Sequence, residues 1–211
     1  MHIQKIGHCC LVIEVGGVRI MTDPGRFTRE QVQEKGIDVI LITHLHADHL
    51  DQETFPEVIA HNPTARIITN TEVAGILLKK GIEAEVLEEG TLEISGVAIG
   101  AHTTAHEHIY DGIVLPKNVG YVVSGLYIPG DSYTVPDISV DVLALPISAP
   151  WGKVAGAIDF ARSVGAKRCF PIHDGILSGE GQAVFNRVIQ NQLEKQGIVY
   201  TPLSKGEGIA V

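Results

Sequence analysis

Three histidines and two aspartates lie close together in the nine residues THLHADHLD at positions 43–51. The apolar run IDVILI comes directly before them, so they follow a predicted buried strand, where a rigid scaffold commonly positions functional loops. His44 and His46 are two residues apart, and Asp48 and His49 are adjacent, so a tight loop can direct these pairs to two neighbouring points. Imidazole and carboxylate bind divalent transition metals, and this stretch would supply most ligands of a metal pair.

Further candidate ligands follow later apolar runs. TTAHEHIYDG offers His106 or His108, with His102 as a third candidate; IPGDS offers Asp131, and FPIHDG offers His173. Loops at strand ends gather at one edge of a sheet, so these side chains are expected to meet the first cluster. We favour a hydrogen-bonded structural role for His102 and His108, and His108 is also a candidate contact to substrate in the stretch 107–118. For the first cluster we favour a metal, because five polar groups that are costly to bury need a common partner.

The composition limits the expected partners and location. The formal net charge of the 211 residues is −9 and the basic residues are scattered, so nucleic acid is not an expected partner. The sequence has no apolar run of membrane-spanning length and no secretory signal, so we expect a cytoplasmic protein with no membrane partner. The three cysteines do not suggest a disulfide framework, and we expect Cys9 and Cys10 to be small buried hydrophobic residues.

Strand and helix patterns alternate along the chain. CLVIEV and VRIMT surround Gly16-Gly17 and predict a hairpin, and GYVVSGLYI predicts a second one with Ser124-Gly125 at its turn. Continuous apolar runs such as DVLALPI predict strands that are covered on both faces. Thr71 is the expected cap of one helix. Helices are predicted over 28–36, 52–62, 71–81, 153–165 and 182–197, and further strands over 65–69, 83–88, 90–94, 97–101 and 167–172.

The two halves of the chain share a weak repeat. Each half has a hairpin, an acidic loop with Asp23 or Asp131, a buried strand, a helix and a further strand. Two such halves would pair their sheets face to face with helices outside, which predicts an α/β protein with a four-layer αββα sandwich. Chance similarity among common short motifs is the alternative. No linker-like or low-complexity segment interrupts the sequence, so residues 1–211 are predicted to form one domain.

The motif THLHADH, followed by His106, by GD at 130–131 and by PIH at 171–173, resembles the metallo-β-lactamase superfamily over nearly the whole chain. The opening GHCCLVIEVGGVRIMTDP is similar to a branch of small, capless metal-dependent hydrolases that includes ascorbate-phosphate lactonase and the phospholipase D that acts on N-acyl phosphatidylethanolamine. The resemblance implies the αββα fold and two metal ions. It assigns the first ion to His44, His46 and His106, the second to Asp48, His49 and His173, and Asp131 to both.

The resemblance also implies roles for residues near the metals. Asp23 would orient a metal-bound histidine, since such carboxylates fix the imidazole tautomer; the alternative is a turn-forming residue before a proline. His8 lies where this branch commonly has a histidine followed by small hydroxyl residues, but cysteines follow here, which leaves a substrate role for His8 open. His106 is preferred to His108 because its AH dipeptide is similar to the family's third-ligand stretch.

The predicted function is that of a metal-dependent hydrolase. A hydroxide bridged between two divalent ions would attack an ester, lactone, amide or phosphodiester of a small-molecule substrate. Asp48 is the predicted catalytic residue, which binds the second ion and accepts or shuttles the water proton. The ligands are nitrogen and oxygen; zinc is the first choice, with manganese and iron as alternatives. The stretch 107–118 can lie over the site, and Trp151 can wall its pocket.

Other functions are also compatible with this ligand pattern. A mononuclear iron sulfur dioxygenase of the same fold would contain iron and consume oxygen. A phosphodiesterase or nuclease of this fold usually carries an added nucleic-acid-binding domain, for which 211 residues leave no room. A non-catalytic relative is disfavoured, because a chain that has lost catalysis is free to lose its ligands.

Overall fold

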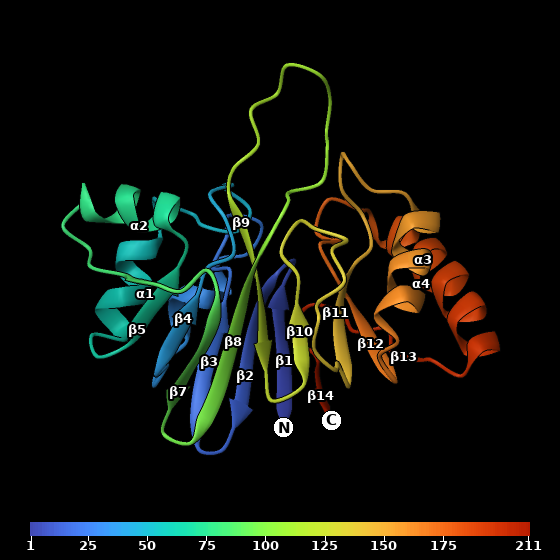
Figure 1. Ribbon diagram of the computed structural model, residues 1–211, viewed down its shortest axis with the longest axis horizontal. Coiled ribbons are helices and arrows are strands. Elements are labelled where there is room, and N and C mark those ends of the chain that lie inside the picture. The colour runs from blue at the N-terminus through green and yellow to red at the C-terminus, as the bar shows by residue number, and fades with distance from the viewer.

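Two seven-stranded sheets pack face to face in the computed structural model, which describes residues 1–211, and helices cover the outer face of each sheet (Figure 1). The predicted α/β fold, a four-layer αββα sandwich, is confirmed. Buried apolar side chains form three clusters, one between the sheets and one between each sheet and its helices. None of the helices combines the length and the apolar character that a membrane crossing requires.

The first sheet contains most of the N-terminal strands. They are β1 (His2–Gly7), β2 (Cys10–Val15), β3 (Val18–Thr22), β4 (Val39–Leu41), β5 (Arg66–Thr69), β6 (Glu85–Val86) and β14 (Gly208–Ala210). Their order is β14-β1-β2-β3-β4-β5-β6, in which β2 and β3 form the predicted hairpin and β4 to β6 continue in parallel. The outer face carries the 3-10 helix η1 (Glu30–Gln33) and the helices α1 (Phe55–His61) and α2 (Thr71–Leu78).

The second sheet repeats this arrangement. Its strands are β7 (Gly90–Ile94), β8 (Val97–Thr104), β9 (Asn118–Val123), β10 (Leu126–Ile128), β11 (Val142–Pro146), β12 (Arg168–Ile172) and β13 (Val199–Tyr200). Their order is β13-β12-β11-β10-β9-β8-β7; β9 and β10 form the second predicted hairpin, and β11 to β13 continue in parallel. The outer face carries α3 (Val154–Val164), α4 (Gly179–Leu193) and the 3-10 helix η2 (Glu194–Gln196).

The continuous apolar runs form strands because both of their faces are covered. Successive side chains of a strand point to opposite faces. In β11, Val142 and Ala144 therefore enter the cluster between the sheets. Leu143 and Leu145 enter the cluster under α3 and α4. A strand that is buried on both sides has no polar face, which is why its sequence shows no alternation.

Several predicted helix boundaries are wrong, including the start of α1 at Phe55 and the end of α2 at Leu78, and local contacts explain three further differences. The helix expected over 28–36 is reduced to η1, because the Gln31 amide donates to two nearby backbone carbonyls that compete with helical bonding. The cap of α2 is Asn70, whose side chain accepts the Val73 N–H in the first turn, whereas Thr71 bonds to a glutamate. α4 begins before the predicted helix, because Ser178 caps it.

A buried ion pair links the two sheets close to the strand ends. Lys5 in β1 is 1% exposed and donates to Asp174 Oδ2 at 2.7 Å. The same ammonium group donates to the carbonyl oxygens of Pro171 at 2.9 Å and Leu203 at 3.1 Å. All three protons of the lysine are thus used, so the pair connects the first sheet to the end of β12 with its charges satisfied.

Replacing Asp174 with alanine should destabilise the fold strongly, because it leaves the Lys5 ammonium buried without a counter-charge. The expected loss in the free energy of unfolding is about 3–5 kcal/mol, measured by urea denaturation. A Lys5→Met/Asp174→Leu double variant removes both charges and should recover most of that loss. Equal stabilities of the Asp174→Ala variant and the unmodified protein would contradict this account.

Candidate metal centre

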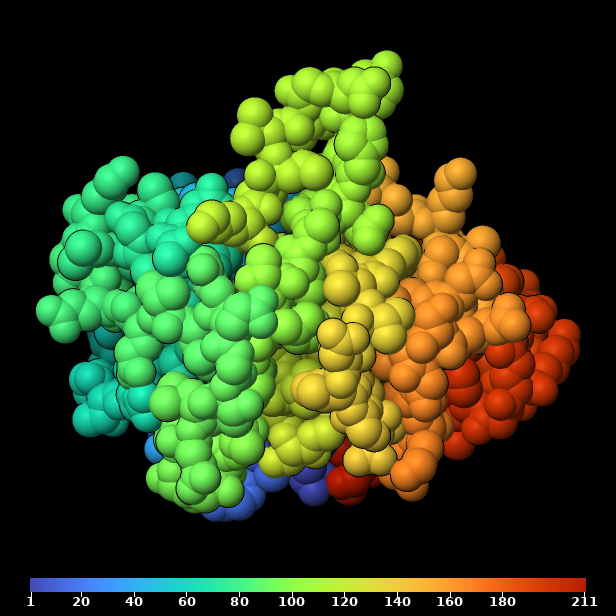
Figure 2. Space-filling view, in the orientation of Figure 1, coloured from blue at the N-terminus to red at the C-terminus, as the bar shows by residue number.

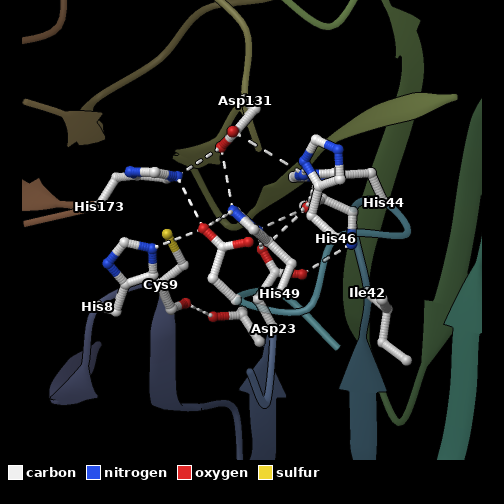
Figure 3. Close-up of polar contacts among 12 residues, drawn as sticks. His8, Cys9, Asp23, Ile42, His44, His46, His49, Asp131 and His173 are labelled. Carbon is white, nitrogen blue, oxygen red and sulfur yellow. Dashed lines mark hydrogen bonds and ion pairs between the residues drawn. The ribbon is translucent and has the colours of Figure 1, made fainter. Parts of the chain in front are cut away.

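The candidate ligands all follow strand ends at one edge of the sandwich. The histidine-rich loop follows β4, while His106, Asp131 and His173 follow β8, β10 and β12. The structure brings the side chains into two adjoining groups around Asp131 (Figure 3). The seven residues that it brings together are His44, His46, Asp48, His49, His106, Asp131 and His173.

The first group contains four side chains whose ligand atoms lie within 4.8 Å of one another, those of His44, His46, His106 and Asp131. His106 Nδ1 donates to the Glu107 carbonyl oxygen at 2.7 Å, which leaves His106 Nε2 as a free lone pair. The Thr43 hydroxyl donates to Asp23 and so accepts from His44 Nδ1 at 3.0 Å. His44 Nε2 is therefore also a free lone pair that faces the group.

The nitrogen atoms of this group are arranged as ligands around a cation. His46 Nδ1 lies 3.1 Å from His44 Nε2 and 3.3 Å from His106 Nε2. One proton on His46 can satisfy only one of these lone pairs, whereas one cation satisfies all three nitrogens. Nitrogen ligands about 2.0–2.1 Å from a tetrahedral zinc ion lie about 3.3–3.4 Å apart, close to the observed spacing. Burial and the neighbouring His49 lower the pKa of His44 well below its ordinary value, which favours the neutral ring that binds metals.

The second group meets the other oxygen of Asp131. His49 Nε2 lies 3.0 Å and His173 Nε2 lies 3.1 Å from Asp131 Oδ1, and His173 Nε2 lies 3.4 Å from Asp48 Oδ2. His49 Nε2, His173 Nε2 and Asp131 Oδ1 are buried without a hydrogen-bond partner. Buried polar atoms normally have partners, so three orphaned atoms that converge on one point form the arrangement that a cation completes.

Both carboxylates are held in the ionised form. Burial opposes ionisation of Asp131, but the facing His173 and His49 imidazoles lower the pKa of this carboxyl well below its ordinary value. Burial also opposes ionisation of Asp48, but the nearby His173 ring and the hydrogen bond from His8 lower the pKa of this carboxyl. Asp131 Oδ1 faces the second group and Asp131 Oδ2 faces the first, so this carboxylate is placed to bridge two cations.

Asp23 holds one histidine of each group. Its buried carboxylate accepts hydrogen bonds from the Thr43 N–H at 2.8 Å, the Thr43 hydroxyl at 2.9 Å and His49 Nδ1 at 2.8 Å. The bond from His49 selects the tautomer that turns Nε2 toward Asp131. The Thr43 hydroxyl in turn accepts from His44, so one carboxylate orients ligands in both groups.

The segment 23–26 also supports the backbone of the ligand loop. The N–H of Arg26 donates to the Ala47 carbonyl at 2.8 Å. Gly25 lies so close to the backbone of Asp48 that a Cβ atom there would overlap the Asp48 carbonyl group. The residue after the proline must therefore be glycine for the two segments to pack, which ties this turn to the position of the ligands.

Strained backbone is concentrated at this site. Five non-glycine residues have positive φ angles, and His8, Asp23 and His173 are three of them, at 51°, 38° and 59°. The other two, Ser95 and Ser124, lie in hairpin turns. Such conformations are costly for residues with a side chain and persist where the surrounding structure imposes them, as functional sites do.

His8 lies beside the second group, but its hydrogen bonds leave no nitrogen free to bind a metal. The Gly175 N–H donates to His8 Nδ1 at 3.0 Å, so the ring proton is on Nε2. His8 Nε2 faces Asp48 Oδ2 at 3.2 Å and donates to it. His8 therefore positions the Asp48 carboxylate, a contact that the residue pattern did not identify.

Two of the histidines considered from the sequence lie outside both groups. His108 is exposed and pairs with Asp111 at 3.2 Å, so the structure brings His106 and not His108 to the other ligands. His102 Nε2 lies 3.1 Å from the Tyr127 hydroxyl. These contacts agree with the structural roles that were favoured for both residues.

Trp151 makes a contact that the sequence did not reveal. Its indole Nε1–H donates to Asp131 Oδ2 at 2.8 Å, so it orients the central carboxylate in addition to lining the site. His173 Nδ1 likewise donates to the Ser148 carbonyl oxygen at 2.5 Å, which directs Nε2 toward Asp131. In this loop the sequence pointed only to the single tryptophan. The contact of His173 with the Ser148 carbonyl could not be predicted, because any residue has a backbone carbonyl.

The chain is similar to known proteins in sequence and in fold. A family model described as a beta-lactamase superfamily domain matches residues 2–173. The Mycobacterium tuberculosis protein Rv0786c is 33% identical over 191 residues, which cover 88% of this chain and 89% of that protein. A UPF0173 metal-dependent hydrolase from Flavobacterium johnsoniae is 32% identical over 168 residues, 70% of this chain and 72% of its own. The metallo hydrolase Igni18 from Ignicoccus hospitalis shares the fold, with a TM-score of 0.75, 19% identity and coverage of 99% and 97%.

Replacing Asp23 with asparagine should weaken metal binding without removing any ligand, because the amide cannot accept the same three hydrogen bonds. Loss of such a supporting carboxylate typically lowers metal affinity by about 10–100-fold. Competition with a chromogenic chelator measures the change. The control is Asp159→Asn on the exposed face of α3, which should bind metal as the unmodified protein does. An unchanged affinity in a folded Asp23→Asn protein would refute the orienting role.

Proposed function

The chain belongs to the β-lactamase superfamily as a metal-dependent hydrolase, and we propose that it hydrolyses a small-molecule substrate with two divalent metal ions. Zinc is the proposed metal, since the ligand spacing of the first group suits a tetrahedral ion; manganese and iron are the alternatives. The first ion would be held by His44, His46 and His106, the second by Asp48, His49 and His173, and Asp131 would bridge both.

The observation that carries this proposal is the set of unpartnered buried atoms around Asp131. His49 Nε2, His173 Nε2 and Asp131 Oδ1 lack hydrogen-bond partners although they are buried. Leaving several such atoms unsatisfied costs free energy that a native protein avoids unless another group completes the site. A cation in each group satisfies these atoms and the crowded imidazole nitrogens together.

The side chains would position the substrate and the attacking water, and the metal ions would act as Lewis acids. Two bound divalent ions provide Lewis acidity and lower the pKa of water toward neutrality. Asp48 is partly exposed and ionised, so it can accept a hydrogen bond from the attacking water and pass its proton on. His8 Nε2–H fixes the Asp48 carboxylate, and the Trp151 indole fixes that of Asp131.

The substrate would enter beside the loop 105–117, which connects β8 to β9. His46 and Asp48 are partly exposed, whereas the other proposed ligands are buried. Loop 105–117 rises from the body at the top of Figure 1, and Figure 2 shows it standing clear of the surface. Three apolar side chains of this loop are exposed: Tyr110 at 73%, Ile113 at 48% and Val114 at 92% of their surface. We propose that they contact an apolar part of an ester, lactone, amide or phosphodiester substrate.

Elemental analysis of the purified protein should find two metal ions per chain. Hydrolysis of generic ester, lactone and phosphodiester substrates should stop after chelation and return when zinc is added back. His44→Ala and Asp131→Ala should lose metal and fall to the background rate of hydrolysis. His2→Ala is the matched control and should keep both properties, because His2 is exposed at the start of β1, at the opposite end of that strand from His8. A single iron per chain, with oxygen consumption and no hydrolysis, would instead support a dioxygenase.

A second expectation concerns the loop. Val114→Asp should raise KM for an apolar substrate by about tenfold, since burying one apolar side chain is worth about 1.5 kcal/mol or more. Its metal content and kcat should not change, because Val114 touches no ligand. Val184→Asp on the exposed side of α4 is the control and should leave KM unaltered. A KM that is equal in all three proteins would exclude substrate contact by the loop tip.

A further inference from the structure

We infer that the thiolate of Cys9 is a ligand of the second metal ion, which makes this half of the centre a mixed sulfur, nitrogen and oxygen site. The inference rests on the proposed binuclear function and adds a donor that the metal-ligand motif does not contain. Cys9 was expected to be a small buried hydrophobic residue. It is buried, at 1% exposure, and belongs to the apolar cluster between the sheets, as expected, and its sulfur also lies close to the imidazoles.

The position of the sulfur carries the first part of the argument. Cys9 Sγ lies within 4.8 Å of a ring nitrogen of each of His8, His49 and His173, and Figure 3 shows it among these side chains. The left-handed backbone of His8 turns the chain so that the next side chain points toward the site. The Thr22 hydroxyl donates to the Cys9 carbonyl at 2.8 Å and holds this turn in place.

The neighbouring imidazoles supply the second, independent observation. His49 and His173 are 0% and 2% exposed, and their Nε2 atoms lack hydrogen-bond partners. They already point to one position beside Asp131 Oδ1. His8, whose ring also lies near this sulfur, has both nitrogens occupied by hydrogen bonds. Cys9 Sγ is therefore the nearby donor that can join His49, His173 and the Asp48 carboxylate on the second ion.

The adjacent cysteine provides an internal comparison. Cys10 begins β2 and enters the apolar cluster under α1 and α2, away from the histidines. Burial raises the pKa of its thiol well above the ordinary value, as expected for an inert core residue. The two cysteines differ by one position in the chain, yet only Cys9 faces potential metal ligands.

A sulfur ligand changes which ions the site prefers. On binding, the Cys9 thiol releases its proton to solvent and its sulfur forms a bond to the ion, with no change of oxidation state. Thiolate favours zinc, cobalt and cadmium over manganese, which prefers oxygen ligands. The second site should therefore be more selective than a site made of histidine and carboxylate alone.

Cobalt(II) substitution of the whole protein tests this directly. With both sites filled, the unmodified protein should show a sulfur-to-cobalt charge-transfer band in the near ultraviolet. Cys9→Ser should bind two cobalt ions without this band, and Cys10→Ser should retain it. The Cys9→Ser variant should also bind cadmium more weakly at the second site. Loss of a residue that only supports a ligand lowers metal affinity by roughly 10–100-fold, and loss of a direct ligand should lower it at least as much.

Cadmium-113 NMR of the unmodified protein gives a second readout that needs no variant. One of two resonances should lie at the low field typical of sulfur ligation. Two bound ions with no charge-transfer band and no low-field resonance would overturn the Cys9 assignment and leave the binuclear hydrolase intact. Failure to bind any cobalt or cadmium would overturn the proposed function itself, and the Cys9 assignment with it.

Discussion

The rest of the centre depends on the hydrogen bonds that the Asp23 carboxylate accepts. It accepts two hydrogen bonds from Thr43 and one from His49, all within a fully buried setting. Through the Thr43 hydroxyl it also determines the tautomer of His44. One charged group, placed by a strained turn after β3, therefore orients a histidine in each half of the centre and anchors the loop that carries four of the seven proposed ligands.

The centre also joins the two halves of the fold. The loop after β4 belongs to the first sheet, while His106, Asp131 and His173 follow strands of the second. Asp131 faces both groups, so cations bound there would connect side chains from both sheets. The buried pair between Lys5 and Asp174 makes a similar connection next to His173. The edge of the sandwich that carries the candidate centre is thus also an edge where side chains of the two sheets are joined.

The layers were predictable because apolar runs identify strands, because the two halves share a weak repeat, and because the sequence resembles a known superfamily. Polar residues directly after strands were expected to gather at one edge, but the assignment of ligands to each ion came from the resemblance. The contacts that orient the side chains were not predictable in this way. The positive φ of His8 turns Cys9 toward the histidines, and Trp151 reaches Asp131 from a distant loop. These depend on backbone conformations and long-range packing, which residue types alone do not encode. The helix predicted over 28–36 is wrong for the same reason, since the Gln31 side-chain amide donates to the backbone carbonyl of Gly25, outside the predicted helix.

Loop 105–117 has a consequence for how this protein could diversify. Its two ends are fixed by the pairing of β8 with β9, whereas its tip is exposed. Lengthening such a loop costs little conformational entropy, and changing its tip removes no core contact. Under the proposed substrate contact, mutations at positions 110–114 would alter which molecules are accepted while the proposed metal ligands, including His106 at the base of the loop, stay in place. The tip would then be the rational segment to randomise when a different specificity is wanted.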